Sequence, residues 1–279
     1  MNEQRKKELR KLSLQAKRQV IIGTNRAKSG HPGGSLSCTD ILTYLYFDKM
    51  NIDPKNPQME GRDRLVLSKG HAAPGLYGVL AVRGYFPLEE IEKLRKPYAM
   101  LQGHPDKKGI PGVDMSAGSL GQGISAAAGM ALSAKHFGDK YRVYAFVGDG
   151  ESEEGQVWEA ALFAALKKLN NLTVFVDLNN LQIDGTLDEV NSPLPLDKKF
   201  EAFNWNVIVI DGHDFDQIEA AVAAAEKCTD KPTAIIANTI KGKDVSFMEN
   251  QVNWHGAGPN DEQAAEALAE LDAKIAELD

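Results

Sequence analysis

RVYAFVGDG, residues 142–150, is rich in β-branched and aromatic residues and stops at Gly148-Asp149-Gly150. This composition is typical of a buried strand that ends in a tight turn. Glu154–Leu169 follows with helical periodicity, and the apolar run Thr173–Asp177 comes next. The apolar face predicted for the helix comprises Val157, Ala161, Ala164, Ala165 and Leu169. A strand, a helix and a second strand in this order predict two neighbouring parallel strands joined by a crossover helix.

The same pattern continues on both sides of this unit. Further strand candidates are Arg64–Leu67, Val207–Ile210 and Thr233–Asn238, and Asp216–Cys228 is a further helix candidate. Near-continuous apolar runs separated by helices indicate a sheet that is buried on both faces. We therefore predict a three-layer α/β/α fold with a mostly parallel central sheet, formed by residues 1–279 as a single domain.

Both ends of the chain are predicted to be helices, over residues 1–28 and 260–278. Residues 1–28 contain nine Lys/Arg and two Glu, with Leu9, Leu12, Ala16 and Val20 at helical spacing. This segment contains no aromatic residue, so a solvated amphipathic helix is favoured over a nucleic-acid-binding segment. The C-terminal helix is expected to start at a cap on Asn260 or Asp261. Its expected apolar stripe is Ala265, Leu268, Leu271, Ile275 and Leu278.

Composition excludes several classes of protein. The chain has 279 residues, of which 43% are hydrophobic and 25% charged, so general disorder is excluded. It has only two cysteines, Cys38 and Cys228, which excludes a disulfide scaffold and fits a reducing compartment. The longest uncharged stretch, 115–134, holds four glycines and four serines and is not a membrane span. With no apolar signal core at the N-terminus, we expect a cytoplasmic protein without membrane or nucleic-acid partners.

Oxygen-bearing side chains follow two neighbouring predicted strands. Asp149 comes after the first strand, and Asn179-Asn180 comes after the second. The carboxyl ends of parallel strands meet at one edge of a sheet, so these side chains should lie close together. One carboxylate, one amide oxygen and a nearby backbone carbonyl make a partial site for Mg²⁺ or Ca²⁺. Gly150 would let its backbone amide approach an anion.

Five of the six histidines lie in glycine-rich or turn-like contexts, namely His31, His71, His104, His213 and His255. The sixth, His136, is at a predicted helix end, where a structural role is expected. The spacing contains no paired HxxxH or CxxC, so these residues do not resemble a zinc site. Imidazoles in such turns suit diphosphate binding and proton transfer at sugar hydroxyls. GSLGQG, residues 118–123, does not match a dinucleotide fingerprint and is either a helix start or a close approach to a flat ligand.

Taken together, these motifs resemble the N-terminal, diphosphate-binding part of transketolase. The matching segments are SGHPGGS (29–35), DRLVLSKGHAAPGLY (63–77), GHPD (103–106), GSLGQG (118–123), GDGESEEG (148–155), DLNNLQIDG (177–185), IKGK (240–243) and WHGAGP (254–259). The resemblance implies the thiamine diphosphate-binding fold, with thiamine diphosphate and Mg²⁺ or Ca²⁺ as cofactors. It also implies two-carbon ketol transfer from a ketose phosphate to an aldose phosphate, as in the pentose phosphate pathway.

The resemblance carries over to individual positions. It implies Asp149, Asn179 and the Leu181 carbonyl as metal ligands, with Asn180 as the less favoured amide. The cofactor contacts that it implies are His71, Gly118, Ser119, Leu120, Asp149, Gly150, Glu154, Asn179, Ile183 and His255. The proton handlers or hydroxyl contacts that it implies are His31, His71, His104 and His255. Ser119 departs from the proline of many long transketolases, but only backbone contacts are expected at that position.

Length is the larger departure from the family. The pyrimidine-binding and C-terminal domains of a complete transketolase, with its catalytic glutamate and phosphate-binding arginines, are missing from this chain. We therefore expect the N-terminal subunit of a split transketolase, active only with a C-terminal subunit in an α₂β₂ assembly. The alternatives are the α subunit of a 2-oxo acid dehydrogenase and a non-catalytic thiamine diphosphate-binding module. The sugar is open between pentose phosphates and branched or modified sugars.

Overall fold

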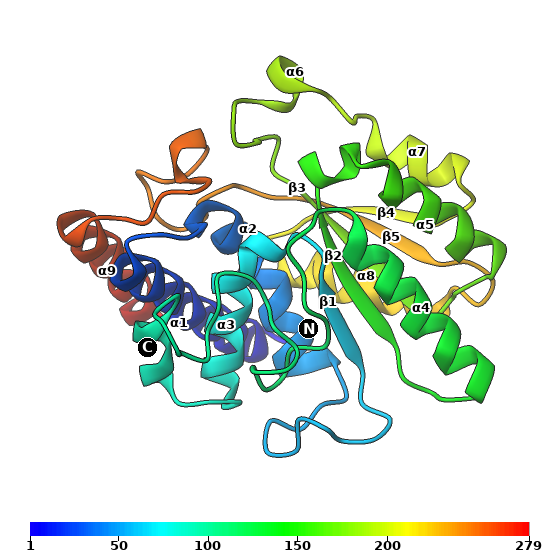
Figure 1. Ribbon diagram of the computed structural model, residues 1–279, viewed down its shortest axis with the longest axis horizontal. Coiled ribbons are helices and arrows are strands. Elements are labelled where there is room, and N and C mark those ends of the chain that lie inside the picture. The colour runs from blue at the N-terminus through cyan, green and yellow to red at the C-terminus, as the bar shows by residue number, and fades with distance from the viewer. Residues whose placement is uncertain (279) are drawn as a thin grey trace.

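A parallel sheet lies at the centre of the computed structural model, which describes residues 1–278 (Figure 1). Its strands are β1 (Arg64–Leu67), β2 (Val143–Gly148), β3 (Leu172–Leu178), β4 (Asn206–Asp211) and β5 (Thr233–Asn238). They are ordered β1-β2-β3-β5-β4, and each neighbouring pair is parallel. The predicted α/β fold is therefore confirmed, and every strand predicted from the sequence lies in this sheet. The register pairs Gly148 with Asp177, so β2 and β3 end side by side.

Helices cover both faces of the sheet. The helices of residues 1–278 are α1 (Glu3–Ala27), α2 (Pro32–Tyr44), α3 (Ala73–Arg83), α4 (Gln122–Phe137), α5 (Gly155–Leu166), α6 (Leu187–Val190), α7 (Leu196–Ala202), α8 (Phe215–Lys227) and α9 (Asp261–Ala276). Short 3₁₀ or π turns occur at Leu45–Lys49, Gly70–Ala72, Leu88–Lys93, Gly150–Glu153 and Val252–Trp254. Alternate strand residues face opposite layers, as a pleated strand requires. Tyr144 and Phe146 pack with α2, α3 and α8, whereas Ala145 and Val147 pack with α4, α5 and α7.

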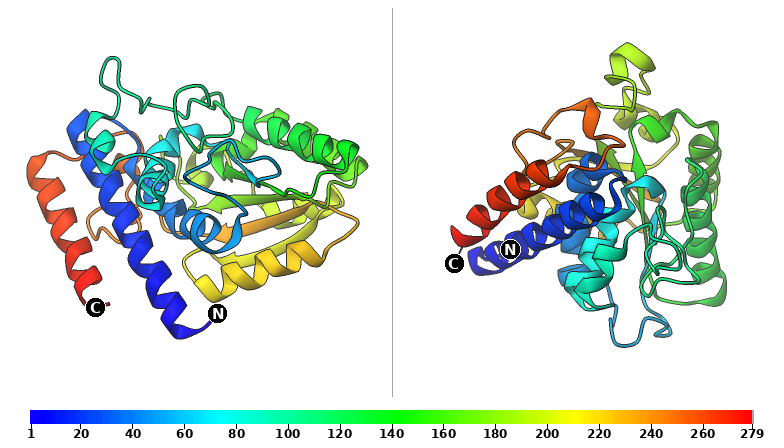
Figure 2. Two further views of the ribbon diagram at one scale, coloured as in Figure 1. Left: turned by 90° about the horizontal axis from the view of Figure 1, so that it is seen from below. Right: turned by 60° about the vertical axis from the view of Figure 1, so that its left-hand side comes forward.

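Helix α1 is not the solvated surface helix that its charge suggests. It packs against α2, α3 and α9, and α9 lies beside it as an outer layer (Figure 2). Leu9, Ala16 and Val20 are buried as predicted, but Lys17 is also fully buried. Its ammonium group is within 2.9 Å of Asp40 and Asp244, which come from other parts of the chain. Such long-range pairing offsets the cost of burying an ammonium group and leaves no trace in the local sequence.

The C-terminal helix confirms the predicted cap and corrects the predicted stripe. Asn260 caps α9, because its side chain accepts a hydrogen bond from the Gln263 amide and Gln263 reciprocates. The face that packs on α1 is centred on Ala264, Ala267 and Leu271, while Ala265 is exposed. The predicted stripe was thus wrong at Ala265, because alanine spacing alone does not fix the rotation of a helix. In residues 1–278, no helix combines the length and apolarity needed to cross a membrane.

Helix α5 is shorter than predicted at its C-terminal end. It stops at Leu166, and Lys168 adopts a left-handed backbone conformation with φ of 50°. Leu169 is still buried, but it follows this turn rather than belonging to the helix. The periodicity of the apolar residues continued past the helix, so sequence spacing could not locate its end.

Candidate functional site

A pocket of about 150 Å³ opens at the carboxyl ends of the strands, where the Asp149 and Asn179 loops were predicted to meet. Its wall is formed by the loops after β2, β3 and β5, together with parts of three N-terminal segments. The lining residues are Gly34, Lys69, His71, Leu120, Gly148, Asp149, Gly150, Glu151, Asn179, Leu181, Gln182, Ile183, Lys241 and His255. Of the predicted cofactor contacts, the pocket includes His71, Leu120, Asp149, Gly150, Asn179, Ile183 and His255.

Asp149 is a buried carboxylate held by backbone amides. Its Oδ1 accepts from the Gly150 amide at 2.8 Å. Its Oδ2 accepts from the amides of Asn179 at 2.8 Å and Asn180 at 2.6 Å. Burial and the neighbouring charge of Asp177 raise the pKa of Asp149 to about 6. A divalent cation beside this carboxylate would offset both effects, which fits the metal that the resemblance implies.

The two asparagines differ in their positions. Asn179 is buried and lines the pocket, whereas Asn180 is exposed and has a left-handed backbone with φ of 63°. Asn179 is further held by a hydrogen bond from its Nδ2 to Asp177 Oδ2 at 3.2 Å. The geometry thus favours Asn179 over Asn180 as the amide ligand. In residues 1–278, no three His, Cys, Asp or Glu side chains gather as a metal site, and Asp149 would be the one charged ligand.

Two buried lysines were missed by sequence reasoning. Lys241 Nζ donates to the Leu181 carbonyl at 2.9 Å and to His255 Nδ1 at 2.9 Å. Burial lowers the pKa of Lys241 to about 8. Lys69 is paired with Asp177, and although burial disfavours its charge, this carboxylate raises the pKa of Lys69. Both lysines precede glycine in SKGH and IKGK, and this was the only signal available in the sequence.

The pocket has room for a phosphate-bearing ligand near these cations. A Cβ atom built at Gly34 would lie 3.6 Å from His71 Nε2 and 4.0 Å from Lys69 Nζ, so glycine keeps this wall open. Ammonium and imidazole groups on one side and the Asp149 loop on the other suit a diphosphate bridged to a divalent cation. The residues present therefore fit thiamine diphosphate and its metal.

Four histidines that are far apart in the sequence converge beside the pocket. The ring centroid of His31 lies 5.2 Å from that of His71, 5.6 Å from His255 and 6.4 Å from His104. The rings of His71 and His255 stack at 5.2 Å. These are the four histidines predicted as proton handlers. The other two lie elsewhere, since His136 is in the last turn of α4 and His213 contacts Asp40 and Ile240.

The clustered imidazoles are neutral near pH 7. Burial, together with the positive charge of Arg95, lowers the pKa of His31 to about 4. Burial and the ammonium of Lys241 lower the pKa of His255 to about 3. Burial also lowers the pKa values of His71 and His104. Since Lys241 donates to His255 Nδ1, the proton of that neutral ring is on Nε2. Neutral rings can both accept and donate protons, as acid–base chemistry at hydroxyl groups requires.

The remaining predicted cofactor contacts do not line this pocket. Gly118 lies against the ring of His104, with a built Cβ atom 3.7 Å from His104 Cγ, and Ser119 is exposed. Glu154 is exposed next to Gly121, whereas Glu151 is the buried carboxylate of this motif. Glu151 accepts hydrogen bonds from Ser68 at 2.5 Å, from the Gly121 amide at 2.8 Å and from the Gly148 amide at 3.0 Å. In GDGESEEG, three glutamates are close in sequence, so the motif alone could not tell which one faces inward.

The lowered imidazole pKa values predict that the chain loses stability in mild acid. The unfolded chain takes up protons on His31 and His255 as the pH falls through about 6.5, whereas the folded chain takes them up only near pH 4 and 3. Through these two imidazoles the free energy of unfolding should therefore fall between pH 7.5 and pH 5, and the raised pKa of Asp149 offsets part of this fall. Urea unfolding at several pH values measures this dependence, and His31→Asn should make it shallower. An unchanged slope in His31→Asn would contradict the neutral assignment.

Comparisons with known proteins agree with this geometry. The family described as the transketolase, thiamine diphosphate binding domain matches residues 9–275. The chain is 49% identical over 243 residues to the 6-deoxy-6-sulfo-D-fructose transketolase subunit of Clostridium sp. (strain MSTE9), covering 87% of this chain and 88% of that protein. It is 39% identical over 254 residues to an apulose-4-phosphate transketolase subunit of Phocaeicola vulgatus, covering 91% of this chain and 90% of that protein. The crystal structure of transketolase from Campylobacter jejuni matches with a TM-score of 0.84 and 32% identity, over 100% of this chain and 48% of that chain. The chain thus spans less than half the length of the solved transketolases that it matches.

Proposed function

The chain belongs to the family of transketolase thiamine diphosphate-binding domains, and from this we infer that it is the cofactor-binding subunit of a two-chain transketolase. The reaction proposed is transfer of a two-carbon ketol unit from a ketose phosphate to an aldose phosphate. The observation that carries the proposal is that the pocket and the cluster of four histidines lie together. The Asp149 and Asn179 loops and Lys241 line one pocket, which we propose holds a diphosphate and a cation. His71 and His255 line the same pocket, and His31 and His104 lie beside them.

Within this proposal, the pocket residues hold and orient the cofactor. Asp149, Asn179 and the Leu181 carbonyl would bind Mg²⁺ or Ca²⁺, and the Gly150 amide would contact the diphosphate. His71 and His255 would bind its other oxygens, and the exposed side chain of Ile183 would pack on the cofactor. The backbones of Gly118, Ser119 and Leu120 would contact the aminopyrimidine, and Glu154 would lie near the metal loop. When bound, thiamine diphosphate supplies a carbanion-stabilising centre that lets a carbon–carbon bond next to a carbonyl break.

The four histidines would donate protons to the sugar hydroxyls and accept protons from them. His31 has a buried Nδ1 that makes no hydrogen bond within residues 1–278, so its ring has a polar atom free for a ligand. His255 has its proton on Nε2 and can donate it to an oxygen. His104 is exposed and borders the cluster on the side of Gly118. Because these rings are neutral, each can exchange a proton with a hydroxyl without first losing a charge.

His104→Ala tests the assignment of the histidine cluster to substrate. General acid–base groups typically contribute about 10²-fold or more to turnover, so kcat should fall by about that factor. His104 does not line the pocket, and the Kd for thiamine diphosphate should therefore stay within about threefold. His136→Ala is the matched control, since His136 is an exposed histidine on α4. Loss of cofactor binding with unchanged kcat would assign His104 to the cofactor instead.

We further propose that a second chain completes the enzyme. Two similar proteins are named as transketolase subunits, and this chain aligns with 88% and 90% of their lengths. The partner would supply the pyrimidine-binding and C-terminal domains in an α₂β₂ assembly in the cytoplasm. Ile183 lines the pocket and is 61% exposed, so this apolar side chain is open to contact by the cofactor or by such a complement.

Two classes of sugar are candidates for the ketose donor. Pentose phosphates of the pentose phosphate pathway are one candidate, and a sulfonated ketose is favoured by the 49% identity to the sulfofructose transketolase subunit. Steady-state assays of the chain with its co-purified partner should compare xylulose 5-phosphate, fructose 6-phosphate and 6-deoxy-6-sulfofructose as donors. We expect one donor to exceed the others at least tenfold in kcat/KM. Pyruvate decarboxylation without ketol transfer would replace this function with that of a 2-oxo acid dehydrogenase subunit.

A further inference from the structure

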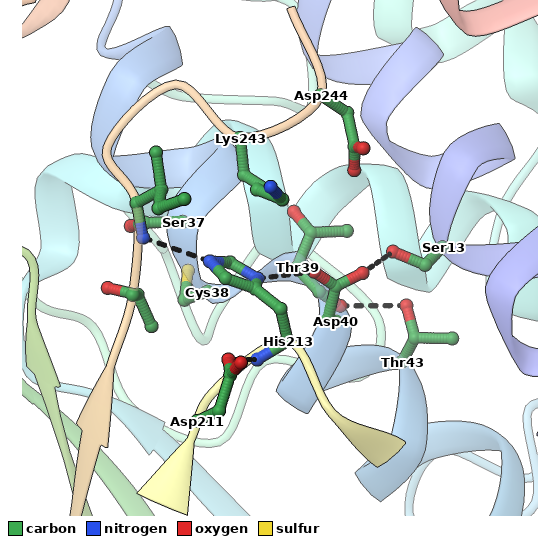
Figure 3. Close-up of polar contacts among 12 residues, drawn as sticks. Ser13, Ser37, Cys38, Thr39, Asp40, Thr43, Asp211, His213, Lys243 and Asp244 are labelled. Atoms are coloured by element: carbon green, nitrogen blue, oxygen red, sulfur yellow. Dashed lines mark hydrogen bonds and ion pairs between the residues drawn. The ribbon is translucent and has the colours of Figure 1, made fainter. Parts of the chain in front are cut away.

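His213 lies outside the pocket, in the turn between β4 and α8, yet both of its ring nitrogens are engaged (Figure 3). Nε2 accepts a hydrogen bond from the Ile240 amide at 2.9 Å, and Nδ1 lies 2.7 Å from Asp40 Oδ2. A backbone amide can only donate, so Nε2 carries no proton. The proton is therefore on Nδ1, which donates to Asp40. The ring side chain is 12% exposed, so this arrangement is largely protected from water.

Asp40 is a fixed anchor for this ring. It is fully buried on α2 and accepts a hydrogen bond from Ser13 Oγ at 2.5 Å (Figure 3). It also accepts a hydrogen bond from Lys17 Nζ at 2.8 Å. Burial opposes its ionisation, but the Lys17 ammonium and the hydrogen bond from His213 hold the pKa of Asp40 well below its usual range. An ionised Asp40 accepts and cannot donate, which fixes the tautomer and the orientation of His213.

The segment 240–244, whose first residue bonds His213, is also held by hydrogen bonds at its last residue, Asp244. Asp244 accepts hydrogen bonds from Lys17 Nζ at 2.6 Å and from Arg10 Nη1 at 2.8 Å. Lys17 thus bonds Asp40 and Asp244 at once. The segment 240–244 is held at its start through His213 and at its end through Asp244, and both connections lead back to helix α1.

Lys241 lies between these two attachments and is adjacent to Ile240. Its backbone carbonyl accepts from the Asn250 amide at 2.9 Å, and its side chain reaches Leu181 O and His255 Nδ1. A displacement of the Ile240 amide would therefore move the Lys241 ammonium relative to both partners. Leu181 and His255 are the carbonyl and the imidazole assigned above to the metal and the diphosphate.

We propose that His213 is a positioning residue for the cofactor pocket. It acts through the Ile240 amide to hold the Lys241 ammonium between the Leu181 carbonyl and the His255 ring. This role rests on the proposed function, because it concerns the affinity of the same pocket for thiamine diphosphate and its metal. The two hydrogen bonds of His213 have different roles in this proposal. The bond to Ile240 positions Lys241, and the bond to Asp40 orients the His213 ring.

Two substitutions remove these bonds one at a time. His213→Asn keeps an amide donor near the place of Nδ1 for Asp40 and leaves the Ile240 amide without an acceptor. His213→Gln places an amide oxygen near Nε2 to accept from Ile240 and gives up the donor to Asp40. The Kd for thiamine diphosphate with Mg²⁺, measured on the chain with its co-purified partner, should rise about tenfold in His213→Asn, as expected for losing one buried hydrogen bond. In His213→Gln it should rise less than about threefold.

A third variant tests whether His213 changes the Kd for thiamine diphosphate through Lys241. Lys241→Met weakens cofactor binding itself, and adding His213→Asn to it should change the Kd by less than about twofold, because the positioned group is gone. The Tm of each variant is measured without cofactor as the stability readout. Equal losses of Tm in His213→Asn and His213→Gln, with the Kd unchanged in both, would overturn the proposal and leave His213 a stabilising residue only.

NMR of the unsubstituted chain without cofactor tests the proposal in a second way. It requires neither that a variant folds nor that the cofactor binds. Long-range ¹⁵N–¹H spectra of the imidazoles in the chain should show the Nδ1–H tautomer for His213, and the Ile240 amide should exchange slowly with solvent. The Nε2–H tautomer would overturn the proposal, because Ile240 could then not donate to that nitrogen. If the unsubstituted protein does not bind thiamine diphosphate, the proposed function fails, whatever the tautomer is.

Discussion

Replacing Asp149 with alanine is expected to abolish metal-dependent binding of thiamine diphosphate, raising the Kd at least about 100-fold. Asp149 is the one charged ligand proposed for the metal. It also accepts hydrogen bonds from the backbone amides of Gly150, Asn179 and Asn180, so its loss frees the two loops that form the pocket floor. Titration calorimetry with thiamine diphosphate and Mg²⁺, on the chain with its co-purified partner, measures the effect.

Asp139→Ala is the matched control, because Asp139 is an exposed aspartate just past α4. It should bind the cofactor as the unsubstituted chain does. Asp149→Asn separates charge from shape, since asparagine keeps one oxygen for the amides but lacks the negative charge. We expect it to lose most of the metal dependence. Unchanged, Mg²⁺-dependent binding in Asp149→Ala would remove the metal assignment.

Asp177→Ala is expected to lower the free energy of unfolding by about 3–5 kcal/mol, the usual cost of breaking a buried ion pair. Asp177 is fully buried at the end of β3 and is paired with Lys69. It also accepts hydrogen bonds from the hydroxyls of Ser37 and Thr239. The substitution leaves the Lys69 ammonium buried without a carboxylate. Urea denaturation of the chain measures the change.

Two further variants make this prediction specific to the ion pair. In a Lys69→Met background no buried cation remains at this position, so Asp177→Ala should cost clearly less than it does alone. Asp184→Ala, at an exposed position in the same loop region, should change stability by less than about 0.5 kcal/mol. Equal costs of Asp177→Ala with and without Lys69 would show that the pair does not stabilise the fold.

The strands could be predicted because the property that identifies them, a short run of apolar residues, is visible within a few consecutive positions. β1 and β5 match the apolar runs Arg64–Leu67 and Thr233–Asn238 residue for residue, and β2, β3 and β4 differ from their predicted ranges by one residue at each end. A strand that is buried on both faces must be apolar throughout, and this property is visible in one short window of sequence. Because parallel strands end together, the meeting of the Asp149 and Asn179 loops followed from the strand order in the chain.

Features that depend on distant partners were not predictable in this way. Lys17 is buried because Asp40 and Asp244 meet it, and these three residues come from three separate segments. Glu151 rather than Glu154 faces the pocket because Ser68 and two glycine amides donate hydrogen bonds to a carboxylate at that position. The convergence of the four histidines came from the family resemblance, since their sequence separations contain no helical or strand periodicity. Lys241 was missed because its role depends on a carbonyl 60 residues away.

The central claim is that this chain performs ketol transfer only together with a second chain. The most direct test measures two-carbon transfer from each candidate donor to ribose 5-phosphate, with thiamine diphosphate and Mg²⁺ present. It compares the purified chain alone with the chain isolated from its own cells together with bound proteins. We predict activity in the second sample alone, with the partner identified in it. Activity of the chain alone, or cofactor binding without transfer of any donor in both samples, would contradict the claim.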